Sequence, residues 1–277
     1  MPEGDTIHQL VAELEPRLVG RTLQGGRLRD EPGFPLDGRV VQGVRAHGKH
    51  LWIELADGRS IRSHLGMYGS WHRYAHGERW RKPPRRASIV LETERDVLVC
   101  FQAKEVDVVL DGDGSRLALE RRLGPDLCVP RDEWASLPPR ARTKRPPETP
   151  LVDILLDQSI ASGIGNVYTS ELLFLFGLHP RRPLGATTDA TLEELYRHAT
   201  ELLLANARRG GTRRTDARAI HDEGTRPQTA ASGALWVYRR AGEPCRRCTT
   251  AIANARLGRH RRSTYWCPTC QPDPRAE

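Results

Sequence analysis

Residues 245–270 are CRRCTTAIANARLGRHRRSTYWCPTC, and the two Cys-x2-Cys pairs in this stretch indicate a metal site. Cys248 and Cys267 are separated by 18 residues, a spacing typical of two thiolate pairs that close one tetrahedral zinc site. Cys245 and Cys270 complete the expected ligand set, which leaves no open position, so we expect one structural Zn2+ ion. Two disulfides are the alternative. The metal site is favoured because we expect no secretory segment, and such pairs in cytosolic proteins usually bind metal.

The segment between the cysteine pairs predicts a hairpin that grips a phosphate backbone. It is crowded with basic side chains and ends in two aromatic ones: Arg256, Arg259, His260, Arg261, Arg262, Tyr265 and Trp266. A metal-fixed hairpin with this composition is suited to nucleic acid, because arginine and lysine supply the sequence-independent part of phosphate binding.

The composition favours a polyanionic partner. The chain has 277 residues, with 43 Lys+Arg against 35 Asp+Glu, a formal net charge of +8 and 38% hydrophobic residues. The positive charge suits nucleic acid, and a chain of this length supports about two modest cores. No apolar run is long enough to span a membrane. The N-terminus also lacks the pattern of a signal peptide, so we expect a cytoplasmic protein.

The first half of the chain predicts one helix followed by an antiparallel β-sandwich. Apolar residues at helical spacing predict an amphipathic helix over 5–18, capped by Asp5 or Thr6. Pro16 should kink or shorten its last turn. Short β-like runs follow with no helix between them, at 40–44, 51–55, 60–64, 87–93, 97–101 and 106–110. Strands at such short spacing predict an antiparallel sandwich.

The second half changes to helical periodicity after a proline-rich stretch. Residues 131–150 mix prolines with basic residues and have the composition of an interdomain linker. Beyond them we predict helices at 151–160, 167–176 and 191–207. The predicted fold class is α+β and multidomain. Its expected parts are an N-terminal helix plus antiparallel β-sandwich (1–130), the linker (131–150), a helical domain (151–232) and a zinc finger (233–277).

The first residues supply a possible nucleophile. Met1 precedes Pro2, and a small second residue normally allows the initiator methionine to be removed. Pro2 would then present a secondary α-amine, with an ordinary pKa of about 8 that the start of the 5–18 helix should lower further. Such an amine can attack a sugar carbon to form an iminium, and the adjacent Glu3 offers a carboxyl for acid–base work.

Short motifs then occur in one order along nearly the whole chain. They are PEGDT at 2–6, HGKH at 47–50, SHLGMYG at 63–69, GIGNVY at 163–168 and RSTYWC at 262–267. This order closely resembles the formamidopyrimidine-DNA glycosylase and endonuclease VIII family of base-excision repair enzymes. The opening Pro-Glu-Gly looks more like the endonuclease VIII branch.

The resemblance implies a bifunctional DNA glycosylase and abasic-site lyase. Pro2 would attack C1′ of a damaged nucleotide and expel the base, and the iminium would promote β- and δ-elimination. Glu3 would be the general acid/base. Lys49 matches the family's hairpin lysine, which contacts phosphate and the departing base or sugar; its alternative is a solvated turn lysine.

The resemblance also implies DNA contacts in the second half. Asn166 lies in the family's helix–two-turn–helix element, and it is equally a good N-cap for a helix beginning at Val167. Arg262 matches the zinc-finger arginine that grips the phosphates flanking the lesion. Its spacing to Cys267 favours it over Arg261.

Met67 and Tyr68 stand in a glycine-flanked loop that suits a protruding probe. A base that leaves the stack leaves a gap, and apolar wedges such as methionine can occupy it. The alternative is a buried strand end. No Arg-Arg-Phe-like insertion is found in 97–110, so we expect the loop around Met67 to fill the gap alone.

The motifs that should indicate the class of lesion do not all match one branch of the family. Residues 63–67 resemble the formamidopyrimidine branch, Tyr68 resembles the endonuclease VIII branch, and residues 209–232 resemble a loop that caps oxidised purines. Thr6 stands where the family often has a second glutamate, and we assign it no catalytic role. We favour oxidised pyrimidines in damaged double-stranded DNA, bound by a monomer, with oxidised purines as the alternative. Two other classes also fit the charge and cysteines: a DNA-binding protein that kept the fold but lost catalysis, and a zinc-ribbon RNA-binding protein.

Overall fold

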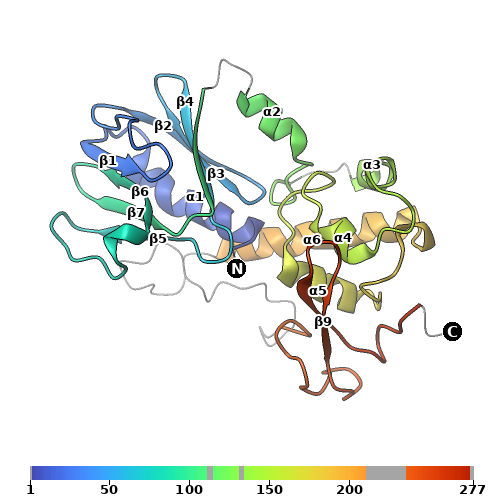
Figure 1. Ribbon diagram of the computed structural model, residues 1–277. Helices are drawn as coiled ribbons and strands as arrows, with labels where there is room; N and C mark the ends of the chain where they lie inside the picture. Colours follow the sequence, from blue (N-terminus) through green and yellow to red (C-terminus); the bar gives the residue numbers. More distant parts are fainter. Residues whose placement is uncertain (1, 111–114, 131–133, 210–234, 275–277) are drawn as a thin grey trace. The chain divides into compact units, whose positions relative to one another are not determined.

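The computed structural model describes residues 2–110, 115–130, 134–209 and 235–274 (Figure 1). They fall into two compact units. The N-terminal unit holds the residues up to 122 together with residues 207–209, and the C-terminal unit holds residues 123–206 and the described residues from 235 onward. Each unit has its own apolar core. Among the described residues, no helix is both long and apolar enough to cross a membrane.

Helix α1 (Gly4–Leu18) opens the N-terminal unit and buries one stripe. Ile7, Leu10, Leu14 and Leu18 are each at most 1% exposed, which confirms the predicted amphipathic helix. The predicted cap was wrong, because the helix begins one residue earlier, with Glu3 in extended conformation at the N-cap position.

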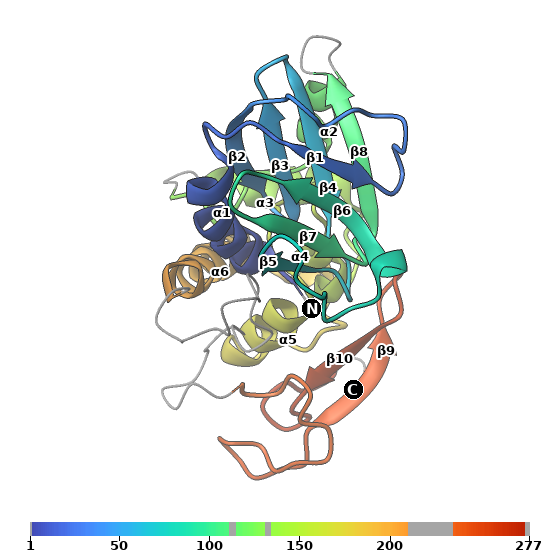
Figure 2. The same cartoon turned by 90° about the vertical axis from the view of Figure 1, so that its left-hand side faces the viewer.

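Two four-stranded antiparallel sheets form the predicted sandwich, with strand orders β1-β6-β7-β5 and β2-β3-β4-β8. The strands are β1 (Gly25–Leu28), β2 (Val41–His47), β3 (His50–Leu55), β4 (Arg59–His64), β5 (Ser70–Tyr74), β6 (Ala87–Glu92), β7 (Val97–Phe101) and β8 (Glu105–Leu110). Figure 2 shows the sheets as layers, with β1, β6 and β7 in front of β2, β3 and β4. Helix α1 packs against β2 and β3, and its apolar stripe joins the core between the sheets.

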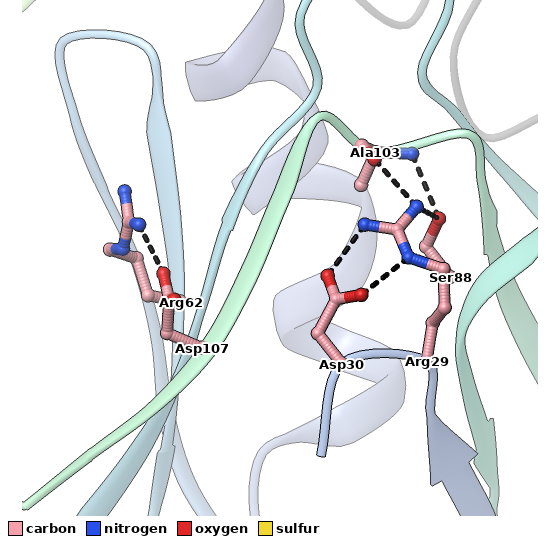
Figure 3. A network of polar contacts seen from close by, with 6 residues as sticks. All are labelled: Arg29, Asp30, Arg62, Ser88, Ala103 and Asp107. Atoms are coloured by element: carbon pink, nitrogen blue, oxygen red, sulfur yellow. Dashed lines mark hydrogen bonds and ion pairs between the residues drawn. The ribbon is translucent and has the colours of Figure 1, made fainter. Parts of the chain in front are cut away.

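A polar network links the edge strand β1 to the chain that leads into β8 (Figure 3). The Arg29 guanidinium donates to Ser88 Oγ and to the carbonyl of Ala103, each at 2.9 Å. Its hydrogen bonds to Asp30 are the largest cause that lowers the pKa of that carboxyl. On the other sheet Arg62 binds Asp107. The network therefore fixes the backbone at Ala103, next to Lys104.

The C-terminal unit is built from helices and one hairpin. Its elements are α3 (Leu137–Lys144), α4 (Leu151–Leu156), α5 (Asn166–Leu175), α6 (Asp189–Arg209) as far as Asn206, β9 (Ala253–Leu257) and β10 (Arg262–Trp266). Helix α2 (Ser115–Arg122) ends the N-terminal unit, and short 3-10 turns lie at Pro84–Arg86, Trp134–Ser136 and Leu184–Ala186. We did not predict α2, because its sequence SRLALERR carries no apolar stripe.

The expected linker contains structure. Leu137 and Ala141, spaced by one helical turn, are at most 1% exposed and join the core of the C-terminal unit. Proline lies at the start of α3, where the helix needs no N–H donor. The predicted helix over 151–160 is shorter than expected and ends at Leu156, because the Asp157 carboxylate accepts the Ser159 N–H at 2.9 Å and turns the chain.

Candidate active site and nucleic-acid interface

Pro2 and Glu3 lie at the entrance to helix α1. Both residues are buried, and Glu3 is 1% exposed. The carbonyl of Glu3 accepts the N–H of Ile7 at 3.2 Å, which makes it part of the first helical turn. Asp5 and Thr6 complete a buried polar start to the helix. The fold therefore holds the carbonyl of Glu3 in the first helical turn, with the predicted nucleophile and acid both buried.

Lys49 lies in the two-residue turn between β2 and β3. Gly48 precedes it with φ +56°, a conformation that favours glycine, and His47 pairs with His50 across the turn. Burial is the largest cause that lowers the pKa of His64 to about 4; Glu105 opposes the shift and the Lys49 ammonium adds to it. Lys49 therefore belongs to a positive sheet edge on which the neighbouring imidazole is neutral at pH 7.

The loop 65–69 leaves β4 at the same edge, because His50 and His64 are register partners and their rings lie 5.0 Å apart. Met67 and Tyr68 at its tip are 58% and 70% exposed, so the alternative of a buried strand end is wrong. Gly66 has φ +64°, and a Cβ there would lie 2.8 Å from that of Lys104. A tight glycine-bounded loop thus projects two large side chains into solvent beside the Lys49 turn.

The four C-terminal cysteines form one cluster. Their Sγ atoms all lie within 4.8 Å of one another, with Cys248 at 3.4 Å from Cys267 and Cys245 at 4.0 Å from Cys270. A tetrahedral zinc ion with bonds of about 2.3 Å places its sulfurs about 3.8 Å apart, whereas a disulfide needs about 2.05 Å. All four cysteines are free. The donor set fits one tetrahedral ion and not two disulfides.

Main-chain donors support these sulfurs. The N–H of Arg247 points to Cys245 Sγ, and the N–H of Cys270 points to Cys267 Sγ, each at 3.4 Å. Hydrogen bonds of this kind stabilise thiolates, the form in which cysteine binds a metal.

The hairpin between the cysteine pairs carries its basic residues on the outside. Strands β9 and β10 are antiparallel with Leu257 opposite Arg262, and the turn 258–261 joins them. The exposed basic residues are Arg256, Arg259, His260, Arg261 and Arg262. The structure thus gathers the predicted phosphate-binding groups on one hairpin.

Asn166 is the first residue of α5 and is 5% exposed. The prediction that it caps the helix was wrong, because Gly165 occupies the cap position. Instead its Nδ2 donates to the carbonyl of Ser263 at 2.7 Å, and its Oδ1 finds no donor among the described residues. Asn166 thereby fixes the strand residue that follows Arg262.

Comparison with known proteins places the chain in a family. Residues 1–106 match the formamidopyrimidine-DNA glycosylase N-terminal domain, and residues 123–217 match the H2TH domain of formamidopyrimidine-DNA glycosylase. The DNA-(apurinic or apyrimidinic site) lyase Nei2 of Mycolicibacterium smegmatis is 38% identical, over 98% of this chain and 99% of that protein. The chain belongs to the formamidopyrimidine-DNA glycosylase and endonuclease VIII family.

Within this family the chain is closer to endonuclease VIII, as predicted. A probable endonuclease 8 2 of Streptomyces coelicolor is 37% identical over 99% of this chain and 95% of that protein. A formamidopyrimidine-DNA glycosylase of Gloeobacter violaceus is 33% identical over 98% of each. The Lactococcus lactis Fpg in complex with an abasic site containing DNA superposes with a TM-score of 0.80 and 22% identity, over 98% of this chain and all of that one. The predicted fold class is thereby confirmed.

Two buried side chains that hold the C-terminal segment were not predicted from the sequence. Glu171, fully buried in α5, accepts the N–H groups of Trp236, Val237 and Tyr238 at 2.7 to 2.9 Å. Gln271 accepts the N–H of Cys267 and donates to a carbonyl of the helical region. A lone glutamate within an apolar helix was the available signal, because a buried charge requires partners.

Proposed function

We propose that the chain is a bifunctional DNA glycosylase and abasic-site lyase of base-excision repair, acting through the amine of Pro2. The observation that carries the proposal is that Pro2 and Glu3 open a chain 38% identical, over almost its entire length, to a protein named as an abasic-site lyase. Their buried position at the start of α1 supports it. The presence of Pro2, Glu3 and Lys49 together counts against a DNA-binding protein that lost catalysis.

In the proposed reaction the lone pair of the Pro2 amine forms a bond to C1′, the bond from C1′ to the base breaks, and the amine proton passes to the departing base. Glu3 donates a proton to the sugar ring oxygen as the ring opens, which leaves an iminium at C1′. Loss of a C2′ proton then expels the 3′ phosphate, and a second elimination expels the 5′ phosphate. Water finally releases the sugar fragment from Pro2.

The remaining predicted residues have binding roles in this proposal. Lys49 and Arg262 hold backbone phosphates through their side chains, and Asn166, whose side chain is bound to Ser263, offers its backbone N–H at the start of α5. Binding should weaken as salt is added, because the release of counterions from DNA becomes less favourable. Met67 and Tyr68 enter the gap left by the extruded base, which their exposure supports. Cys245, Cys248, Cys267 and Cys270 hold a structural Zn2+ ion, which fixes the hairpin and takes no part in the chemistry.

We propose damaged double-stranded DNA with an oxidised pyrimidine as the substrate. The Pro-Glu-Gly opening supports this class, as does the 37% identity to the probable endonuclease 8 2 of Streptomyces coelicolor, against 33% for the Gloeobacter violaceus formamidopyrimidine-DNA glycosylase. Oxidised purines are the second candidate, because residues 209–232 resemble a purine-capping loop. All but the first of these residues lie outside the described part of the chain.

The test is reductive trapping. Purified protein is incubated with duplex DNA containing thymine glycol or an abasic site, and borohydride is added to reduce any iminium to a stable bond. We expect a covalent adduct that peptide mapping locates on residue 2. Pro2→Gly replaces the secondary amine by a primary one, whose imine must gain a proton to become an iminium. It should therefore strongly reduce base release from thymine glycol while leaving DNA affinity nearly intact.

Lys49 supplies the matched control, because it is the other predicted site residue with an amine. Lys49→Arg keeps a positive charge and cannot form an imine, so trapping on residue 2 should persist in this variant. An adduct mapped to Lys49 and not to residue 2 would remove Pro2 from the mechanism. Absence of any adduct on both substrates would leave a non-catalytic DNA-binding protein.

A further inference from the structure

The turn of the arginine hairpin is held by a carboxylate from another element. Asp153, in the first turn of α4, is 9% exposed. Its Oδ1 and Oδ2 lie 2.9 and 3.1 Å from the backbone N–H of Arg259, which donates to them. The contact joins positions 106 residues apart in the chain. A buried carboxylate thus replaces water at the main chain of the hairpin tip.

The turn is shaped to this carboxylate. Gly258 has φ +69°, and a Cβ at this position would lie 2.4 Å from Asp153 Oδ1, so only glycine admits the approach. Arg261 closes the turn with φ +46°, unusual for a residue with a side chain, and its N–H donates to the carbonyl of Gly258. Conformational strain of this kind persists only where surrounding contacts enforce it.

Arg262 follows this turn directly and is therefore fixed from two sides. On one side Asp153 holds the turn 258–261, and on the other Asn166 Nδ2 binds the carbonyl of Ser263. Phosphate contacts depend on where the guanidinium is presented, because they set the register of a protein on the duplex.

We infer that Asp153 is a positioning residue for phosphate binding, acting through the hairpin turn to present Arg262. The inference rests on the proposed DNA-binding role of that arginine. Asp153 touches no substrate in this arrangement.

The sign of the effect separates this role from simple electrostatics. The negative charge of Asp153 repels phosphate, whereas the exposed basic residues of the hairpin attract phosphate. If the carboxylate only contributed its charge, its removal would strengthen DNA binding. If it positions the turn, its removal weakens binding in spite of the lost repulsion.

The experiment measures the affinity of the full-length, zinc-loaded chain for a duplex with a tetrahydrofuran abasic analogue across a range of salt concentrations. We expect Asp153→Ala to bind about five- to tenfold more weakly and to lower the slope of log K against log[salt] by up to about 1, the value of one phosphate contact. Asp153→Asn keeps an accepting oxygen and should bind nearly as the parent does. Glu243→Ala removes an exposed acid two residues before Cys245 and should not weaken binding.

A double-mutant cycle with Arg262→Ala tests whether Asp153 affects DNA binding through Arg262. Because Asp153 acts through Arg262, Asp153→Ala should cost little further affinity once that arginine is gone. Gly258→Ala displaces the same turn by a second means and should reproduce the loss if Asp153→Ala fails to retain zinc. Binding by Asp153→Ala that equals or exceeds that of the parent, or losses that add fully with Arg262→Ala, would overturn the inference.

Failure of the proposed function has a different signature. A parent chain that forms no borohydride adduct refutes the lyase while leaving these binding comparisons intact. An Arg262→Ala variant that binds as the parent does removes the arginine's role, and with it the inference drawn for Asp153.

Discussion

A buried histidine in β5 shows how a single residue links protonation to stability. Ser70 Oγ accepts a hydrogen bond from the Lys82 ammonium at 2.7 Å and lies 2.9 Å from His72 Nε2. An ammonium can only donate, so the hydroxyl proton of Ser70 is available to a neutral imidazole. Burial, followed by the charges of Lys82 and Arg81, lowers the pKa of His72 to about 4.

The stability of the N-terminal unit should therefore depend on pH through His72. Its pKa in the unfolded chain is about 6.5, so its contribution is complete above that pH and is lost as pH falls toward the folded pKa of about 4. Between pH 7 and pH 5 the loss amounts to about 2 kcal/mol. His72→Gln should flatten the pH dependence of the free energy of unfolding by about this amount.

Urea unfolding of both proteins at several pH values measures this difference. His50 and His64 are present in both proteins, so their own pH dependence cancels in the comparison. Equal pH slopes for parent and variant would show that His72 titrates normally.

At the scale of elements, helix α5 contacts both the core of the C-terminal unit and residues 235–274, the metal-binding ribbon that holds the four cysteines. Its apolar face enters the core of the C-terminal unit, while Glu171 and Asn166 bind the main chain of the ribbon at two points. The Glu171 carboxylate accepts three main-chain N–H groups, so this one side chain holds three consecutive residues of the C-terminal segment.

Replacing Glu171 by glutamine should destabilise the C-terminal unit. The amide loses the charge and turns an NH2 group toward backbone donors, which we expect to cost about 3 kcal/mol. Trp236 lies at this contact, so its fluorescence reports the change during urea unfolding. Zinc release to a chromogenic chelator should also accelerate.

Glu201→Gln is the matched control, because Glu201 is an exposed partner of Arg197 on α6. Surface pairs of this kind contribute at most about 1 kcal/mol. Similar small losses for both glutamates would contradict the anchoring role of Glu171.

The elements that were predicted share a clear local pattern, and those that were missed lack one. Strands such as β6 and β7 consist largely of apolar residues, and α1 repeats its leucines at helical spacing. Strand β1 (GGRL) and strand β5 (SWHRY) form because neighbouring strands pair with them, which no local pattern reveals. The same reason explains α3, whose Leu137 and Ala141 have meaning only against a core supplied from elsewhere.

The candidate site divides in the same way. Residue type and order along the chain were sufficient to predict the cysteine cluster and the exposed Met67 loop. They could not predict the partners of Asp153 and Glu171, because these are main-chain groups distant in the sequence, although a lone glutamate in an apolar helix signals that a partner exists. Hydrogen bonds to main-chain groups leave no complementary residue type that a sequence could display.

At the scale of the whole molecule, the two units carry different parts of the proposed activity. Pro2, Glu3 and Lys49 belong to the N-terminal unit, whereas the cysteine cluster and the arginine hairpin belong to the C-terminal unit. Each unit has its own core, so the loss of one metal ion should affect them unequally.

Removal of the metal should therefore weaken DNA binding without unfolding the β-sandwich. Once the thiolates lose their shared ion, the hairpin no longer has a fixed base, and we expect affinity for abasic duplex to fall at least about tenfold. Treatment with a mercurial and a chelator, followed by binding assays and circular dichroism, measures both effects. Metal-free protein that binds DNA as tightly as the zinc-loaded protein would contradict the role given to the hairpin.

The exposed tip of the loop 65–69 has a chemical consequence of its own. The sequence contains two methionines, and after removal of Met1 the thioether of Met67 is the only one left. It is 58% exposed, so an oxidant in solution reaches it directly. Its sulfoxide is polar and poorly suited to the interior of a base stack. A protein proposed to repair oxidised DNA thus carries its one remaining methionine at the loop tip that would enter the DNA duplex. Peroxide can oxidise this side chain and so weaken its insertion, and a methionine sulfoxide reductase can reverse the oxidation.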